Sequence, residues 1–136
     1  MELDTGTGRV TILRYSAAAF AGRVVNPRLA QLQNDGNVIF GLGPALMEEI
    51  LFDGGQATNP NLADYAIPSI LDIPVELIST CIESEAGEMY GIGEMTLAPV
   101  APAVANAIED TVGVKIKDLP ITAEKILRAL KEKSER

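Results

Sequence analysis

The sequence predicts an α+β fold, with a small mixed sheet and two or three helices packed against it. Apolar residues recur every three or four positions from Arg28 to Leu51 and again after Thr122, which indicates helices. Val75 to Ile82 instead alternates its side chains as a strand does. No repeat, low-complexity tract or linker separates these segments, so we expect residues 1–136 to form a single domain.

Composition and charge exclude several classes of function. The chain is 47% hydrophobic but only 4% aromatic, so its core should be aliphatic. Its net charge of -8 argues against binding to nucleic acid or to an anionic membrane surface, because both require a basic patch.

The chain contains one cysteine and no histidine. A disulfide within the chain is therefore excluded, and neither a Ser-His pair nor a structural zinc site is expected. We predict no metal held by side chains. Cys81 lies in an apolar run and is interpreted as a core thiol. With no signal peptide or long apolar run, we expect a cytoplasmic protein without a membrane span.

Two strands and a helix start are predicted near the N-terminus. Residues 2–4 and 9–15 can pair as a hairpin around the turn at Asp4 to Gly8. Residues 16–21 either continue the second strand or lead out of it. Asn26 suits an N-cap and Pro27 suits the first helical position.

Glycines interrupt the long helical pattern at Gly36, Gly41 and Gly43, and Pro44 should break or kink it. Such glycines indicate close packing against another backbone or a ligand. A glycine-rich helix that merely packs on the sheet is the alternative.

Further along the chain, Phe52 to Gly55 is a predicted turn, and residues 56–66 should be extended or looped. A second helix is expected from about Ala98 to Val112. A third should begin after Thr122 as N-cap, and residues 131–136 should fray.

The stretch Gly91-Ile-Gly-Glu94 is the strongest candidate for chemistry. Two glycines permit close approach of the backbone and unusual φ values, and apolar chain surrounds the turn. This setting indicates a carboxylate that takes part in a reaction at Glu94, and not a solvated surface charge. The alternative is an ordinary acidic residue at the start of the next helix, favoured by the helix dipole.

Motifs of this kind span most of the chain, and the glycine turn is followed by Pro99 to Ile108. The others are Asn26-Pro27, Gln33-x-Asp35-Gly36, Gly41-Leu-Gly43, Ala45-Leu-Met-Glu-Glu49, Asn59-Pro-Asn-Leu-x-Asp-Tyr65, Ile67-Pro68 and Asp118-Leu-Pro-Ile-Thr122. In type and in order along the chain, these motifs resemble those of the molybdopterin-binding subunit of the xanthine dehydrogenase, aldehyde oxidase and carbon monoxide dehydrogenase family.

The resemblance implies a fold like the C-terminal domain of a molybdenum hydroxylase large subunit. It also implies a molybdenum-pterin cofactor, as molybdopterin or its cytosine dinucleotide, bound together with a partner chain. Glu94 would be the general base for hydroxylation of an electrophilic C-H carbon with water as the oxygen source. Gln33, Gly91 and Gly93 would contact the cofactor.

The implied partners are the remaining molybdopterin-binding chain and the FAD and iron-sulfur subunits. The chain departs from the family pattern at three positions. Phe20 stands where the family usually has an Asp, Pro44 stands where a Tyr is common, and Tyr90 stands where a Lys is often found. A second hypothesis is therefore a non-catalytic remnant or assembly module that forms homo-oligomers.

Overall fold

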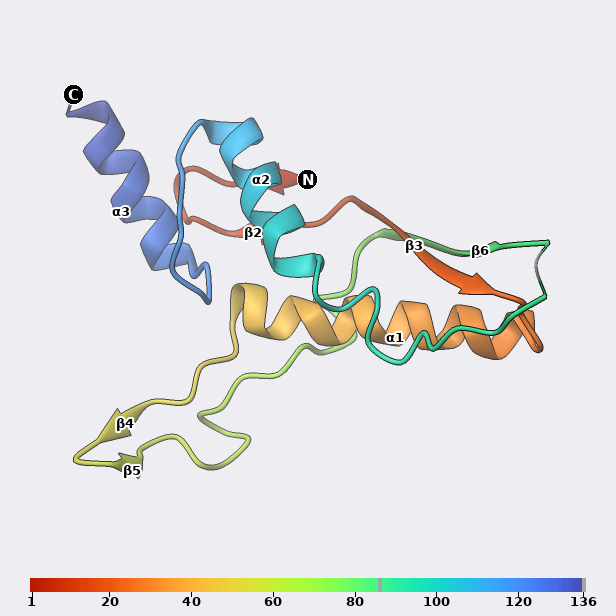
Figure 1. The fold of residues 1–136 in the computed structure, drawn as a ribbon. Helices are drawn as coiled ribbons and strands as arrows, with labels where there is room; N and C mark the ends of the chain where they lie inside the picture. Colours follow the sequence, from red (N-terminus) through yellow and green to blue (C-terminus); the bar gives the residue numbers. More distant parts are fainter. Residues whose placement is uncertain (86, 136) are drawn as a thin grey trace.

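The computed structural model describes residues 1–85 and 87–135, and it confirms the predicted α+β class. Three helices and three two-stranded sheets make up the described part of the chain (Figure 1). The strands are β1 (Glu2–Leu3), β2 (Val10–Thr11), β3 (Arg14–Gly22), β4 (Phe52–Asp53), β5 (Gln56–Ala57) and β6 (Glu76–Glu83). The helices are α1 (Pro27–Leu46), α2 (Val100–Val112) and α3 (Ala123–Ser134).

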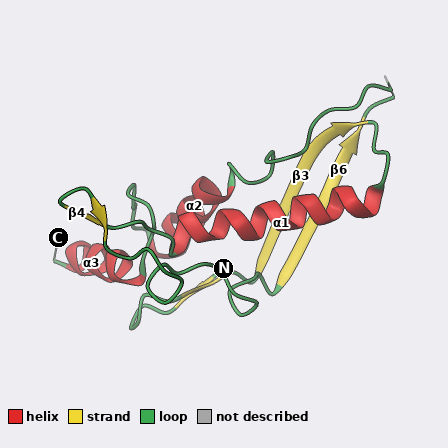
Figure 2. Cartoon of the chain, turned by 90° about the horizontal axis from the view of Figure 1, so that it is seen from below, coloured by secondary structure: helices red, strands yellow, loops and turns green. Residues whose placement is uncertain are grey.

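The main sheet consists of β3 and β6, which run parallel with Tyr15 opposite Leu77. Side chains alternate between the two faces of the sheet. Ala17, Ala19 and Ala21 form the more buried side of β3. These small residues let α1 lie close to the sheet, and Figure 2 shows α1 crossing in front of both strands. The strand predicted at 75–82 is thus confirmed, displaced by one residue.

Two short antiparallel hairpins accompany the main sheet. The predicted N-terminal hairpin forms, but its second strand ends at Thr11, and Arg14 and Tyr15 belong to β3. The hairpin β4–β5 forms around the predicted turn, where Gly54 and Gly55 have positive φ values that favour glycine. This hairpin projects away from the helices in Figure 1.

Helix α1 begins as predicted. Asn26 Oδ1 accepts a hydrogen bond from the Leu29 N–H at 3.1 Å, and Pro27 is the first helical residue. The predicted end at Leu51 is wrong, because α1 ends at Leu46. Pro44 lies in the last turn, where its missing N–H removes only one helical hydrogen bond, and the helix continues for two residues beyond it.

Helix α2 crosses α1 at Gly41. A Cβ atom at this position would lie 2.7 Å from a side-chain carbon of Val100 and 3.0 Å from the Leu97 carbonyl oxygen. The expected close packing of a helical glycine is therefore confirmed here. The core around this crossing is aliphatic, as expected, and comprises Ile12, Val38, Leu42, Val100, Val104, Ile108, Val114, Ile121 and Ile126.

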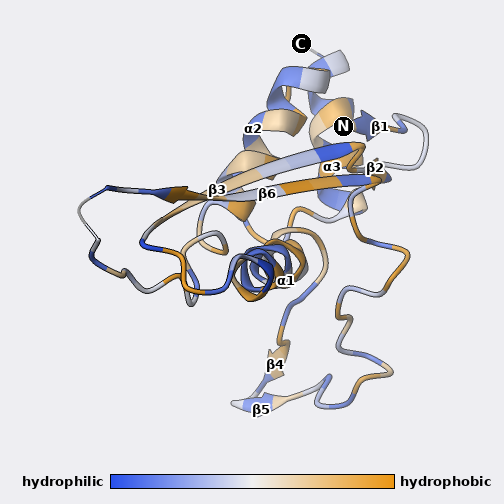
Figure 3. Cartoon of the chain, turned by 90° about the vertical axis from the view of Figure 1, so that its right-hand side faces the viewer, coloured by the Kyte–Doolittle hydropathy of each residue, from blue (hydrophilic) through white to orange (hydrophobic). Residues whose placement is uncertain are grey.

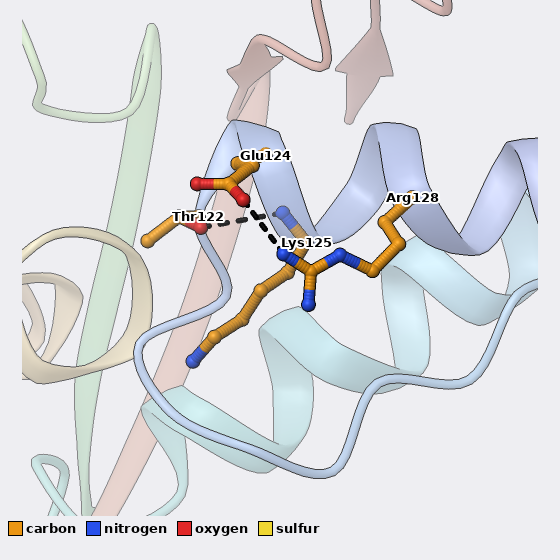
Figure 4. A network of polar contacts seen from close by, with 4 residues as sticks. All are labelled: Thr122, Glu124, Lys125 and Arg128. Carbon is orange, nitrogen blue, oxygen red and sulfur yellow. Dashed lines mark hydrogen bonds and ion pairs between the residues drawn. The ribbon is translucent and has the colours of Figure 1, made fainter.

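Helix α3 starts with the predicted cap, in which Thr122 Oγ1 accepts from the Lys125 N–H at 3.3 Å (Figure 4). Glu124 and Arg128 form an exposed ion pair at 2.7 Å on its first turns. Fraying was expected from residue 131, but the structure has helix to Ser134, and Lys133 Nζ donates to the Val112 carbonyl at 2.8 Å. Residue 136 lies outside the described residues.

No helix in the described part of the chain is long and apolar enough to cross a membrane.

Candidate functional site

The end of β3 holds the segment that leads into the glycine turn. Gly22 has a φ of 64°, and a Cβ atom there would collide with the Glu88 carbonyl oxygen. The Arg23 N–H donates to that oxygen at 2.7 Å, and the Tyr90 N–H donates to the Ala21 carbonyl at 3.0 Å. These bonds require a glycine at position 22 and direct residues 91–94 back along α1.

Phe20 and Tyr90, two of the departures from the family pattern, lie together at this point. Their ring centroids are 5.4 Å apart, within the range for a favourable aromatic pair. The Tyr90 hydroxyl donates to the Glu88 carboxylate at 2.8 Å. In this chain the two residues therefore contact each other, and they connect β3 to the segment before the turn.

Helix α1 holds the turn through side-chain amides. Gln33 Nε2 donates to the Gly93 carbonyl at 2.7 Å, and Asn37 Nδ2 donates to the Ile92 carbonyl at 3.4 Å. The Thr96 hydroxyl donates in return to the Asn34 carbonyl at 3.3 Å. Three polar contacts thus connect one helix to the five residues around Glu94.

The sequence prediction included Gln33 in the site but missed Asn34, Asn37 and Thr96. A signal for the first two was present, because they are polar residues about one helical turn or less from Gln33 in a mostly apolar helix. Thr96 carried no such signal, since its burial depends on the packing of the turn against α1.

Glu94 lies on the exposed side of the turn. Among the described residues, no side chain or backbone N–H bonds or pairs with its carboxylate, while its backbone carbonyl accepts from the Leu97 N–H at 3.2 Å. Helix α2 begins only at Val100 and has no acidic residue in its first turn. The alternative that Glu94 is an ordinary first-turn residue of that helix is therefore wrong.

The glycines of the turn do not have the unusual backbone conformation that was expected. Gly91 and Gly93 are absent from the positive-φ glycines of the described chain, and a Cβ atom on either would meet nothing within 4 Å. Neither backbone strain nor packing within this chain requires glycine at these positions. They expose bare backbone beside Glu94, where a second molecule can approach closely.

The predicted site residues are thus partly brought together. Gln33 is bonded to the turn, so its amide nitrogen is engaged within the chain, while its Oε1 has no partner among the described residues. No group of three or more His, Cys, Asp or Glu residues in the described chain is arranged to hold a metal ion. A bound group would therefore meet one carboxylate, one amide oxygen and the exposed backbone.

Behind these residues lies a buried polar layer between α1 and β6. Asn34 is fully buried, and its Nδ2 donates to the Thr80 carbonyl and to Cys81 Sγ, both at 3.3 Å. Asn34 Oδ1, Asp35 Oδ1 and Ser79 Oγ are buried and have no hydrogen-bond partner among residues 1–85 and 87–135. Cys81, expected in the core, is half-buried in this layer.

Comparison with known proteins decides the family. The molybdopterin cofactor-binding domain model matches residues 1–74, more than half of the chain. The chain belongs to the molybdopterin cofactor-binding domain family. Gln33 lies inside this match, whereas Gly91, Gly93 and Glu94 lie outside it.

Longer alignments reach the glycine turn. The aldehyde oxidoreductase molybdenum-binding subunit of Escherichia coli K12 is 37% identical over 134 residues, which is 94% of this chain and 18% of that subunit. A probable xanthine dehydrogenase subunit of Bacillus subtilis 168 is 35% identical over 98% of this chain and 18% of that protein.

The fold agrees with these relationships. The crystal structure of quinoline 2-oxidoreductase from Pseudomonas putida 86 superimposes with a TM-score of 0.84 at 30% identity, covering 96% of this chain and 17% of that one. The chain thus spans less than a fifth of the length of these relatives. The resemblance to molybdopterin-binding subunits and the expected α+β fold class are both confirmed, and the chain is related to molybdenum-binding oxidoreductases.

The residues of the site fit a pterin cofactor on one side only. The open space at Gly91 and Gly93 would admit a flat, polar group against the backbone, and Gln33 Oε1 would accept from its ring N–H groups. The described residues form one wall and no enclosure.

Proposed function

We propose that this domain, residues 1–136, supplies one wall of the molybdenum-pterin site of a hydroxylase, with Glu94 as general base. The observation that supports the proposal is the exposed carboxylate of Glu94, which no described residue bonds or pairs with, on a turn that α1 holds in place through Gln33 and Asn37. Some exposed carboxylates, such as those of Asp4 and Glu124, cap a turn or form an ion pair. Others, such as that of Asp53, also have no bond or ion pair among the described residues, so the hold of α1 on its turn is what distinguishes Glu94.

Each residue has a defined task in this proposal. The Gly91 and Gly93 backbones and Gln33 Oε1 would hold the cofactor, as molybdopterin or its cytosine dinucleotide. The bound cofactor would supply the redox chemistry, as acceptor of the hydrogen and the two electrons that are released when the C-H bond of the substrate is replaced by a C-O bond. Glu94 would accept the proton of a water-derived oxygen as that oxygen attacks an electrophilic C-H carbon, and would hold it on its carboxylate.

A carboxylate is a suitable base here because its oxygen atoms can accept a proton. The hydrogen bonds from Gln33 and Asn37 orient the turn without neutralising Glu94 itself. A fixed base beside the reacting carbon removes part of the entropic barrier to proton transfer.

The complete enzyme would require other chains. We propose that the remaining molybdopterin-binding chain closes the site, and that FAD and iron-sulfur subunits receive the electrons. The assembly would be cytoplasmic.

The alternative proposal is a non-catalytic module of this family that self-associates. Its support is the number of large apolar side chains on the surface, Leu62, Leu71 and Val75 among them. In that case purification would yield homo-oligomers without molybdenum.

The experiment that tests the proposed function is Glu94→Gln in the complex purified from the host. We expect kcat to fall by about a hundredfold or more, the low end for a lost general base, with molybdenum content unchanged. Glu85→Gln is the matched control, because Glu85 is an exposed carboxylate on the preceding loop, and it should retain activity. Full turnover by the Glu94 variant, or a complex without molybdenum, would refute the proposal.

A further inference from the structure

Helix α1 has an apolar side that the described part of the chain leaves largely exposed. Leu29, Leu32, Gly36 and Phe40 recur at spacings of three and four, so they share one face of the helix. Leu29, Leu32 and Phe40 remain 61%, 66% and 55% exposed. We call these four residues the outer face of α1.

The opposite side of the same helix is already packed. Asn34, Val38 and Leu42 are buried, and they lie about half a helical turn away from the outer face. Figure 3 looks nearly along α1 and shows β3 and β6 together on one side of it. A helix that is apolar on both sides is typical of a protein interior and not of a surface.

Gly36 lies at the centre of the outer face, and neither its backbone conformation nor its packing against the described residues requires a glycine there. A Cβ atom there would meet nothing within 4 Å, and Gly36 has no positive φ. Glycine is a poor helix former, so an exposed glycine in mid-helix destabilises α1 without any compensating contact. The compensation would come from another backbone packed closely against this position.

We propose that the outer face of α1 is the docking surface for the part of the molybdopterin-binding subunit that lies outside this 136-residue domain. The relatives carry that part, because this chain matches only 17 to 18% of their length. This inference rests on the proposed function for the identity of the partner.

The chemistry of the face specifies what the partner presents. None of its four residues has a charged or hydrogen-bonding side chain, so the partner surface must be apolar, with a small residue or bare backbone opposite Gly36. Gln33 borders the face and bonds to Gly93. A chain seated on the outer face is therefore adjacent to the turn that carries Glu94 and can close the open side of the site.

The test uses Gly36→Ala, for which the proposal predicts opposite effects in the free and the bound chain. Alanine favours the helix, so the isolated domain should melt at a higher temperature. Binding to the purified molybdopterin-binding chain of the same host should weaken by about tenfold, because the added methyl group overpacks the interface. Gln31→Ala, on the same helix but off the outer face, should leave the dissociation constant unchanged.

A second variant guards against an ambiguous result. Leu32→Asp places a charge on an already exposed position, so the domain should stay folded by circular dichroism while binding falls by at least about a hundredfold. Binding that neither Gly36→Ala nor Leu32→Asp affects would overturn the proposal. So would a wild-type domain that forms only homodimers through this face, or that remains a monomer in the presence of that chain.

The result of the binding test can be distinguished from the result of the turnover test that addresses the proposed function. Association is measured on chains without regard to turnover, so a complex that binds through the outer face but tolerates Glu94→Gln supports the docking surface and refutes the general base. Loss of turnover in Glu94→Gln with normal binding by Leu32→Asp gives the reverse result.

Discussion

The domain contains two regions that are stabilised by different means. The helices and the main sheet enclose an aliphatic cluster in which Val38, Leu42 and Ile126 are fully buried. Residues 47–75 extend away from that cluster as a hairpin and a long loop (Figure 1). In this extension the large apolar side chains are on the outside, and Leu71 is 86% exposed.

Polar contacts hold the extension in place of a core. The Asn59 side chain is buried and bridges the backbone, donating to the Glu49 carbonyl at 2.7 Å and accepting from the Leu51 N–H at 2.9 Å. The Tyr65 hydroxyl donates to the Glu48 carboxylate at 2.8 Å, which raises the pKa of Tyr65. The comparison shows that burial stabilises the site-bearing region, whereas a few hydrogen bonds stabilise the extension.

The largest effect on stability is expected in the first region. Leu42→Ala should lower the free energy of unfolding by about 3 kcal/mol, because it removes buried methyl groups and leaves a cavity. Leu71→Ala, the matched change in the extension, should alter it by less than about 0.5 kcal/mol. Urea unfolding followed by circular dichroism measures both, and equal losses would show that the two regions share one core.

A smaller, local effect is expected from Asn59→Ala. The substitution leaves the Glu49 carbonyl and the Leu51 N–H without their partner, so local opening of the extension should become easier by about 1–2 kcal/mol. Hydrogen exchange should accelerate at Leu51 and Thr58 while the amides of α1 keep their protection.

The control for this change is Asn61→Ala, since Asn61 is exposed and its side chain bonds only within its own turn. It should leave exchange at Leu51 unaltered. If Asn59→Ala instead lowered protection throughout α1, the extension and the core would unfold as one unit.

The smallest effect concerns pH. The Ser69 hydroxyl, at 2.6 Å, and the Ser69 N–H, at 2.8 Å, donate to the Asp72 carboxylate and lower its pKa below the ordinary 3.8. Since the folded pKa is depressed, the charged form favours the folded loop above about pH 4, and this contribution disappears as the pH falls through the folded pKa.

Proteolysis of the loop should therefore become faster below about pH 4 with an acid-stable protease such as pepsin. Asp72→Asn should abolish that pH dependence and leave urea unfolding of the core nearly unchanged. A wild-type cleavage rate that stays flat from about pH 5 to about pH 3, after correction for the protease's own profile, would contradict this account.

Local chemistry in the sequence was sufficient to predict several elements. The caps at Asn26 and Thr122 depend on one side chain and the next three residues. The alternation of residues 75–82 reports a strand in the same local way. The motif at Gly91 to Glu94 was also visible, since it is contiguous.

Long-range contacts decided the rest. The parallel pairing of β3 with β6 joins residues about sixty positions apart, and no local pattern specifies that register. The end of α1 depended on where the chain turned back to the Gly43 carbonyl, which accepts from both Met47 and Glu48.

The sequence by itself thus determined the class of the fold and the family motifs, because helix periodicity, capping and a contiguous glycine turn are local properties. The resemblance carried by those motifs is what implies that Glu94 is the candidate base. Only the tertiary structure decided that Asn37 and Thr96 hold that turn and that the outer face of α1 is left open. Both depend on how α1 is rotated against the sheet, and this rotation follows from the packing of residues distant in the chain.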